Sequence, residues 1–313
     1  MKSETVIDVQ NVWFSYRRNG EAIKSISFNV KKGEIFGFLG PNGAGKTTTI
    51  RLIATIFKPD KGKLSILGFD SAKNGLEIRK RIGVVLQREN YEYNMSVFNN
   101  MWVYGVMRGI KSAELKVRIR YLLKKLNLWG KRSIKMSDLS QGQIRRVQIA
   151  RELLHMPELF ILDEPTVGLD PLGKRWLLNY FRALAKKGTT IFYTTHILNE
   201  AEYLCDRIAI INHGKIVKIG RSEDLKKNFE KKKFFEVEVN SNLEKLVKIL
   251  KSYGIHIESR SGKTVTISSD NNDSIVGALN KFKRYASNSI EHMGSKHISL
   301  EDAFIGLLDG KHG

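Results

Sequence analysis

The sequence predicts an α/β fold for most of the chain, followed by a small α+β domain. A glycine-rich loop lies between an apolar run, Glu34–Leu39, and a segment of helical character, Thr48–Ile56. A second apolar run, Leu159–Leu162, ends in two adjacent carboxylates. From about Arg221 the composition shifts, and short strand and helix patterns alternate. These observations predict buried strands joined by helices, and then a second domain.

Length and composition are those of a globular protein. The 313 residues allow one large and one smaller domain, each with its own core. A hydrophobic content of 42% and a charged content of 27% exclude a disordered chain. The sequence has no apolar run near the roughly 20 residues of a membrane-spanning helix, no signal-peptide pattern and a single cysteine, Cys205. We therefore expect a cytosolic protein.

The net charge of +21 calls for an explanation. Nucleic acid, an anionic membrane surface or an acidic partner would each match it, and so would a lysine-rich surface that only aids solubility. The densest basic run, Lys231–Lys233, is too short to be a strong nucleic-acid signal. Charge alone therefore leaves the partner open.

The glycine-rich loop fits the pattern G-x-x-x-x-G-K-[ST] of nucleotide-binding ATPases. Its residues are Gly40, Pro41, Asn42, Gly43, Ala44, Gly45, Lys46, Thr47 and Thr48. Glycines let backbone N–H groups point at a phosphate, Lys46 adds a mobile positive charge, and the Thr47 hydroxyl can ligate Mg²⁺. The start of the following helix also favours an anion. The loop predicts a nucleotide site, against the alternative of a turn that binds nothing.

Two strands are expected upstream of the loop, Val6–Tyr16 and Ala22–Val30. Tyr16 is a candidate to stack on a purine base, although an ordinary strand aromatic would look the same. Downstream we expect a turn at Asp60–Lys63 and a short strand, Leu64–Leu67.

A further buried strand, Ile82–Leu86, ends at Gln87. A glutamine that leaves a core strand near a phosphate could complete a Mg²⁺ shell or position water. A solvated loop amide is the alternative.

A helical subdomain is expected over about residues 90–155. Its first part, Tyr91–Arg108, is rich in aromatics, which form either a core or a groove for a partner helix. Ser112 is expected to cap the next helix. Ser140 and Gln143 then fit a capping box at the start of a third helix, with Gly142 between them. A capped helix start is also an anion site, and spacing alone leaves both interpretations open.

Two adjacent carboxylates, Asp163 and Glu164, follow the apolar strand Leu159–Leu162. Burying unpaired charge is costly, so a solvated turn is a poor explanation. Beside a phosphate loop, Asp163 is the candidate Mg²⁺ partner and Glu164 the candidate base that polarises water. His196 follows another predicted strand, Thr189–Thr195, where it can contact the γ-phosphate or orient water.

Together these segments closely resemble the ATP-binding cassette (ABC) family over about residues 5–228. The matching elements are the base-stacking aromatic at Tyr16, Walker A at Gly40–Thr48, the Q-loop at Gln87, the signature at Leu139–Gln143, Walker B at Leu159–Glu164, the D-loop at Gly168–Asp170 and the switch histidine His196. One departure is Gln141, where the family usually has glycine. Since Ser140 and Gly142 remain, we expect this change to affect fine tuning and not activity.

The resemblance implies an ABC-type P-loop ATPase domain, residues 1–220, with a mixed sheet core, an antiparallel β-subdomain and a helical subdomain. It implies ATP and Mg²⁺ as ligands, and a head-to-tail dimer with each ATP between Walker A of one cassette and the signature of the other. The implied catalytic residues are Lys46, Gln87, Glu164 and His196, and the implied metal site comprises Thr47, Gln87 and Asp163. The implied nucleotide contacts are Tyr16, Gly40–Thr48, Gln87, Ser140, Gly142, Gln143 and Asp170.

The C-terminal part is expected to form a basic linker, 221–233, and an accessory domain, 234–313. We expect a linker helix at Leu225–Lys233 and then the order βαββαβ, which suggests a ferredoxin-like domain. The residues Leu300–Phe304 are expected to open a final short helix. A cassette with such a tail and a closing L-E-D-x-F segment resembles the daunorubicin-resistance type of drug and lipid exporter ATPases.

The expected function is therefore the ATPase subunit of a membrane exporter of a drug, lipid or other hydrophobic compound. It would form a homodimer, or pair with a paralogous cassette, and join a separate integral membrane permease at the inner face of the cell membrane. A soluble ABC ATPase acting on nucleic acid or ribosomes is the alternative, but such relatives usually carry two cassettes or a long coiled-coil insertion. We therefore expect no nucleic acid partner. A non-hydrolysing regulatory subunit is disfavoured by Glu164 and His196.

Overall fold

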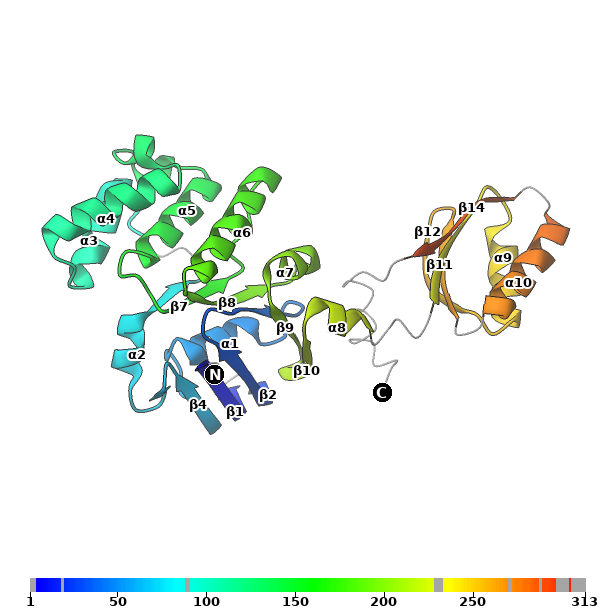
Figure 1. Cartoon of the computed structure of the whole chain (residues 1–313), viewed down its shortest axis with the longest axis horizontal. Coiled ribbons are helices and arrows are strands. Elements are labelled where there is room, and N and C mark those ends of the chain that lie inside the picture. The colour runs from blue at the N-terminus through cyan, green and yellow to red at the C-terminus, as the bar shows by residue number, and fades with distance from the viewer. Residues whose placement is uncertain are drawn as a thin grey trace. The chain divides into compact units, whose positions relative to one another are not determined.

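A computed structural model describes residues 4–17, 20–87, 91–227, 233–269, 272–286, 289–296 and 304. The chain divides into two compact units, Met1–Arg221 and Ser222–Gly313 (Figure 1). Of the described helices, none is long and apolar enough to span a lipid bilayer.

A mixed sheet of six strands forms the centre of the first unit. Parallel pairing joins five of the strands, and β10 is antiparallel to β9 at one edge. In order across the sheet the strands are β10 (Lys215–Gly220), β9 (Arg207–Asn212), β3 (Ile35–Leu39), β8 (Thr190–Thr195), β7 (Leu159–Asp163) and β6 (Ile82–Val85).

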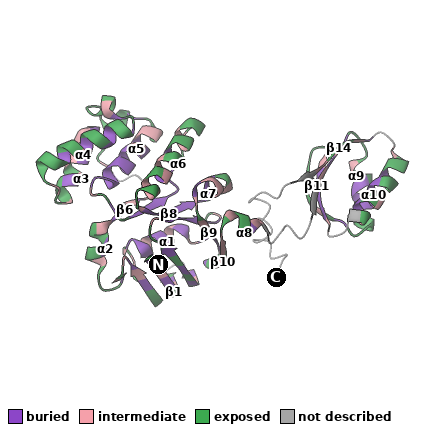
Figure 2. Ribbon diagram, viewed as in Figure 1, coloured by how far each residue is buried: buried purple, intermediate pink, exposed green. Residues whose placement is uncertain are grey.

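The central strands are buried on both faces, which explains their continuous apolar runs. All residues of β7 and β8 are buried (Figure 2). Because side chains alternate along a strand, Leu159 and Ile161 enter one core and Phe160 and Leu162 the other. The first core also contains α1 (Lys46–Ile53) and an antiparallel sheet.

The antiparallel sheet contains β2 (Gly20–Lys31), β1 (Thr5–Tyr16), β4 (Lys61–Ile66) and β5 (Phe69–Asp70), in that order. The helix α2 (Gly75–Arg81) follows it in the chain. The turn predicted at Asp60–Lys63 is wrong for three of its residues. Lys61 and Lys63 pair with Trp13 and Gln10 of β1, so this segment opens strand β4.

Helices pack together on the other side of the central sheet, where their apolar residues share a core with Phe160 and Leu162. The elements are α3 (Val97–Met107), α4 (Ser112–Lys125), the short 3-10 helices η1 (Trp129–Lys131) and η2 (Met136–Asp138), α5 (Gln141–Glu152) and α6 (Pro171–Lys186). The cap predicted at Ser112 is wrong: Lys111 precedes α4, and Ser112 is the first helical residue. A short helix, α7 (Leu198–Leu204), follows β8.

The second unit has the predicted order βαββαβ after an initial helix, α8 (Ser222–Lys227). Its elements are β11 (Lys233–Val239), α9 (Leu243–Ser252), β12 (His256–Ser261), β13 (Thr264–Ser269), α10 (Asn272–Tyr285) and β14 (Ile290–Lys296). The strands form an antiparallel sheet in the order β12-β13-β11-β14. Side chains from α9 and α10 share one core with the sheet.

Two expectations for this region differ from the structure or fall outside it. The linker helix was expected over Leu225–Lys233, but α8 already starts at Ser222, and Lys233 opens strand β11. Early acidic residues Glu223 and Asp224 favour a helix start at Ser222. The predicted final helix lies outside the described residues except for Phe304.

Candidate functional site

The glycine-rich loop connects β3 to α1 and lies close against neighbouring strands. A Cβ atom at Gly40 would lie 2.4 Å from the carbonyl oxygen of Ile211, and one at Gly45 would lie 2.9 Å from Ile23 Cδ1. Gly45 also has φ 112°, in the left-handed region. Only glycine fits both positions, so the loop path is fixed by close approach to the core.

Helix α1 begins at Lys46, two residues before the start that the sequence suggested. The residue before it is Gly45, which has no side chain to cap the first-turn N–H groups. These groups have no acceptor within the helix, and the helix dipole makes them attractive to an anion. The loop and the helix start therefore form a phosphate cradle.

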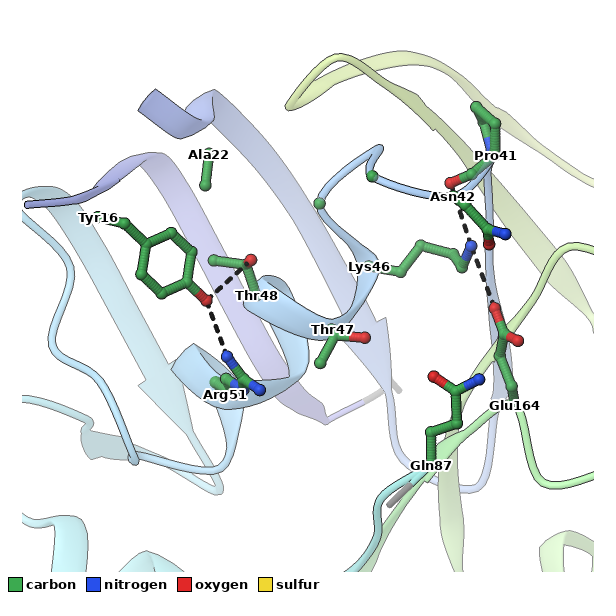
Figure 3. A pocket seen from close by; sticks show the side chains of 12 residues that line it. Tyr16, Ala22, Pro41, Asn42, Lys46, Thr47, Thr48, Arg51, Gln87 and Glu164 are labelled. Carbon is green, nitrogen blue, oxygen red and sulfur yellow. Dashed lines mark hydrogen bonds and ion pairs between the residues drawn. The ribbon is translucent and has the colours of Figure 1, made fainter. Parts of the chain in front are cut away.

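A cavity of about 510 Å³ opens beside the cradle (Figure 3). It brings together residues that are far apart in the sequence. Its lining residues are Tyr16, Ala22, Pro41, Asn42, Gly43, Gly45, Lys46, Thr47, Thr48, Arg51, Gln87 and Glu164. Gly40 and Ala44 belong to the same loop but do not line the cavity, and Ala44 is buried.

Lys46 is almost fully buried and reaches back over the loop. Its Nζ donates hydrogen bonds to the carbonyl oxygens of Gly40 at 2.8 Å and Pro41 at 3.2 Å. It also forms an ion pair with Glu164 Oε1 at 3.2 Å. The Lys46 ammonium group therefore lies between the phosphate loop and the carboxylate of Glu164, which follows strand β7.

Glu164 is held in an uncommon backbone conformation. Its φ is 46°, and its N–H donates to both the carbonyl and the hydroxyl oxygen of Thr194, at 3.1 and 3.2 Å. Its other carboxylate oxygen, Oε2, lies 3.1 Å from His196 Nδ1. A non-glycine residue in this region costs energy and is commonly found at functional sites.

Asp163 is 1% exposed and accepts two hydroxyl hydrogen bonds. Thr194 donates to Oδ1 at 2.7 Å, and Thr47 donates to Oδ2 at 3.0 Å. Burial raises the pKa of Asp163, and the two hydroxyl groups oppose that rise. The carboxylate thus lies directly beside the threonine of the phosphate loop.

Tyr16 forms one wall of the cavity. Its hydroxyl lies 3.3 Å from Thr48 Oγ1 and accepts a hydrogen bond from Arg51 Nη1 at 3.0 Å. Its ring meets Phe57 edge to face, with centroids 5.7 Å apart. Arg51 was missed from the sequence, although it lies four residues after Thr47 on the same helix and so shares its face.

Besides Gly40 and Ala44, four more predicted contacts do not line this cavity: Ser140, Gly142, Gln143 and Asp170. Ser140 and Gln143 form the predicted capping box at the start of α5, with the Gln143 N–H donating to Ser140 Oγ at 3.3 Å. Asp170 caps α6 by accepting from the Gly173 N–H at 2.9 Å, and this bond lowers the Asp170 pKa. Within one chain, these four residues are therefore separate from the cavity beside the phosphate loop.

Comparison with known proteins shows what this arrangement resembles. The ABC transporter family model matches residues 23–167. The linearmycin resistance ATP-binding protein LnrL of Bacillus subtilis is 37% identical over 220 residues, which is 70% of each chain. The Nod factor export ATP-binding protein I of Neorhizobium galegae is 35% identical over 301 residues, 96% of this chain and 84% of the relative. Similarity to the second relative therefore extends beyond the ATPase unit.

Solved structures give the same result. cbiO1 from Clostridium perfringens, part of the ABC transporter complex cbiONQ, is 28% identical with a TM-score of 0.66 over 72% of this chain and 92% of that one. A dimeric ATP-binding cassette in a post-hydrolysis state, bound to ADP and Pi, is 26% identical with a TM-score of 0.64 over 69% of this chain and 98% of that one. With its phosphate cradle, paired carboxylates and these relatives, the chain belongs to the family of ABC transporter ATP-binding subunits and is an ATPase.

Proposed function

We propose that this chain hydrolyses ATP to drive a separate membrane permease that exports a drug, lipid or other hydrophobic compound. The observation that carries the proposal is the chain of contacts from Lys46 through Glu164 to His196, beside the phosphate cradle. Two relatives are named for linearmycin resistance and Nod factor export, and these names support the direction of transport.

We assign a distinct role to each residue of the site. Lys46 and the loop N–H groups bind the outer phosphates, and Tyr16 stacks on the base. Glu164 takes the proton of the attacking water as the water oxygen bonds to the γ-phosphorus and the bond from that phosphorus to the β–γ bridging oxygen breaks, which releases ADP. His196 orients the Glu164 carboxylate. Gln87 lines the same cavity and positions the water.

Thr47, Asp163 and Gln87 fit a Mg²⁺ site. The described residues contain no cluster of three or more His, Cys, Asp or Glu side chains, but Mg²⁺ is usually held by one or two carboxylates together with substrate phosphates. Asp163 is a buried carboxylate with a raised pKa, and the Thr47 hydroxyl lies beside it. When bound, the ion would neutralise phosphate charge.

A second copy of the cassette would complete the site. Ser140, Gly142 and Gln143 lie at a helix start and do not line the cavity of their own chain. In a head-to-tail dimer they would bind the γ-phosphate of a partner's ATP. The dimeric relative with ADP and Pi supports this arrangement. Closure would then depend on the γ-phosphate and would end upon hydrolysis.

A groove on the helical region suits the permease. It lies among Tyr91, Glu92, Met95, Asn100, Val103, Tyr104, Met107 and Arg151. Met107 is 81% exposed and Val103 43%, which leaves apolar side chains open to an amphipathic partner helix. The predicted aromatic segment thus contributes to a core and also to a groove.

Affinity purification from native membranes tests the proposal. An integral membrane protein should co-purify with the full chain, which would then lie at the inner face of the membrane. Met107→Asp should break this association, because a carboxylate would have to be buried in an apolar contact. Met156→Asp changes another exposed methionine outside the groove and should leave the association intact. Recovery of the wild-type chain only from the soluble fraction, with no integral partner, would contradict the proposal.

A further inference from the structure

Helix α5 carries a buried arginine that the motifs above do not include. Arg145 is 6% exposed, although it belongs to a residue type that is usually found at the surface. It lies five positions after Ser140, on the helix that begins with the signature. Its burial requires a specific set of hydrogen-bond acceptors.

Among the described residues, the Arg145 guanidinium donates five hydrogen bonds, four to backbone carbonyl oxygens and one to a side-chain amide. Guanidinium has five N–H groups, so this set can satisfy all of them. The acceptors are Leu86 O at 2.7 Å, Glu164 O at 2.9 Å, Asp163 O at 3.1 Å, Pro165 O at 3.2 Å and Gln148 Oε1 at 3.2 Å.

The four carbonyl acceptors lie on two functional segments. Leu86 directly precedes Gln87, and Asp163 to Pro165 surround Glu164. The arginine comes from a third segment, the signature helix. One rigid planar group therefore fixes the relative positions of the Q-loop, the signature helix and the catalytic carboxylate.

Arg145 also explains how Glu164 keeps its backbone conformation at φ 46°. The N–H of Glu164 is bound by Thr194, and its carbonyl oxygen is bound by Arg145. With both peptide groups held, the side chain is directed at Lys46 and His196. A strained residue persists when the surrounding contacts determine its position in this way.

We propose that Arg145 is a positioning residue for hydrolysis: it holds the Glu164 carboxylate in line for water and links its position to the Q-loop and the signature helix. This inference rests on the proposed role of Glu164. Arg145 itself does not line the cavity.

Single-turnover ATP hydrolysis by the purified full chain tests the proposal, with nucleotide affinity measured separately. Arg145→Met should lower the hydrolysis rate about 100-fold, the size of loss that a small misplacement of a catalytic group can cause. Arg145→Lys keeps the charge but has only three donors, so we expect about a 10-fold loss. Nucleotide affinity should stay within about threefold for both variants, because the cradle is untouched.

Arg118→Met is the matched control. Arg118 lies on α4, outside the site, and also donates to a backbone carbonyl, that of Leu154. Its removal should leave the hydrolysis rate unchanged. If Arg145→Met does not fold, Arg145→Lys decides the question.

A double variant separates positioning from a general structural role. If Arg145 acts through Glu164, then Arg145→Met should change the residual rate of Glu164→Gln by less than about threefold. Full additive loss in that background, or wild-type rates in folded Arg145 variants, would overturn the inference. Unimpaired hydrolysis by Glu164→Gln alone would instead contradict the proposed catalytic site.

Discussion

The Nζ atom of Lys46 and the Oε1 atom of Glu164 lie 3.2 Å apart, and both side chains are less than a tenth exposed. The lysine belongs to the phosphate loop and the glutamate directly follows β7, so the pair links these two segments of one chain. A buried ion pair tolerates the loss of one partner poorly, because the remaining charge is left uncompensated. A substitution that tests catalysis at this pair must therefore lower the hydrolysis rate without unfolding the protein.

Glu164→Gln meets this requirement. The amide keeps the shape of the side chain and can still accept from Lys46, but it cannot take a proton from water. We expect ATP hydrolysis to fall by about 10²- to 10⁴-fold while ATP binding remains. Steady-state phosphate release and binding of a fluorescent nucleotide check the two halves of this prediction.

The control is Glu158→Gln, which removes a carboxylate that pairs with Arg81 away from the cavity. It should hydrolyse ATP at the parent rate. If Glu164→Gln did so too, Glu164 would not be the catalytic base.

Asp163→Asn should weaken the binding of Mg²⁺. Asp163 is buried beside the Thr47 hydroxyl, and the exchange removes the negative charge that would attract the ion. We expect the Mg²⁺ concentration for half-maximal hydrolysis to rise at least about tenfold, a change of about 1.4 kcal/mol in binding free energy. A magnesium titration of hydrolysis measures it.

Without metal, the same variant should be at least as stable as the parent, because an ionised carboxylate no longer has to be buried. Asp8→Asn, a change on β1 where the carboxylate bonds Gln10, should leave the magnesium requirement as it is. An unchanged requirement in Asp163→Asn would remove Asp163 from the metal site.

His155 should make the first unit sensitive to acid. Burial lowers its pKa from the ordinary 6.5 to about 4, and its Nδ1 has no hydrogen-bond partner among the described residues. Between these values the unfolded chain binds a proton that the folded chain does not, so the free energy of unfolding decreases as pH falls from about 6.5 to about 4.

His155→Leu should make this decrease less steep, by up to about one proton in the slope of stability against pH. Chemical denaturation at closely spaced pH values measures the slope. His213→Asn removes an exposed imidazole from a turn with φ 46°, which Asn tolerates, and serves as the control. Equal slopes in the parent chain and His155→Leu would contradict the prediction.

The sequence predicted the core strands well because their signal is local. Continuous apolar runs such as Leu159–Leu162 require burial on both faces, and adjacent polar residues at their ends mark the site. Helix starts were less accurate, since Lys46 and Thr47 enter α1 through the left-handed conformation of Gly45, which composition does not reveal. Arg145 was missed because its acceptors are backbone carbonyls on other segments, and no local pattern predicts a long-range contact to main-chain atoms.

Ser140 caps helix α5 and is also proposed to contact a partner's phosphate. Two substitutions test these two roles separately. The structure shows the capping box at the start of α5, so Ser140→Ala should lose about 1 kcal/mol of stability whether or not a partner's phosphate is bound there. Ser140→Asp is a different test, because aspartate caps a helix as well as serine does but carries a negative charge. If Ser140 contacts the γ-phosphate of a partner's ATP, this charge repels it.

We therefore expect Ser140→Asp to keep the parent unfolding temperature and to lose ATP-dependent dimerisation, measured by light scattering in the Glu164→Gln background. The parent hydrolysis rate should rise more steeply than linearly with protein concentration, since two chains complete each site, whereas Ser140→Asp should stay slow at every concentration. Gln141→Gly, beside it, restores the usual family residue and should change hydrolysis only a few-fold, because Gln141 packs on Gly168 and leaves the helix start intact. A Ser140→Asp variant that still dimerises with ATP would assign Ser140 to capping alone. A carboxylate facing a bound γ-phosphate would repel it and so prevent dimerisation.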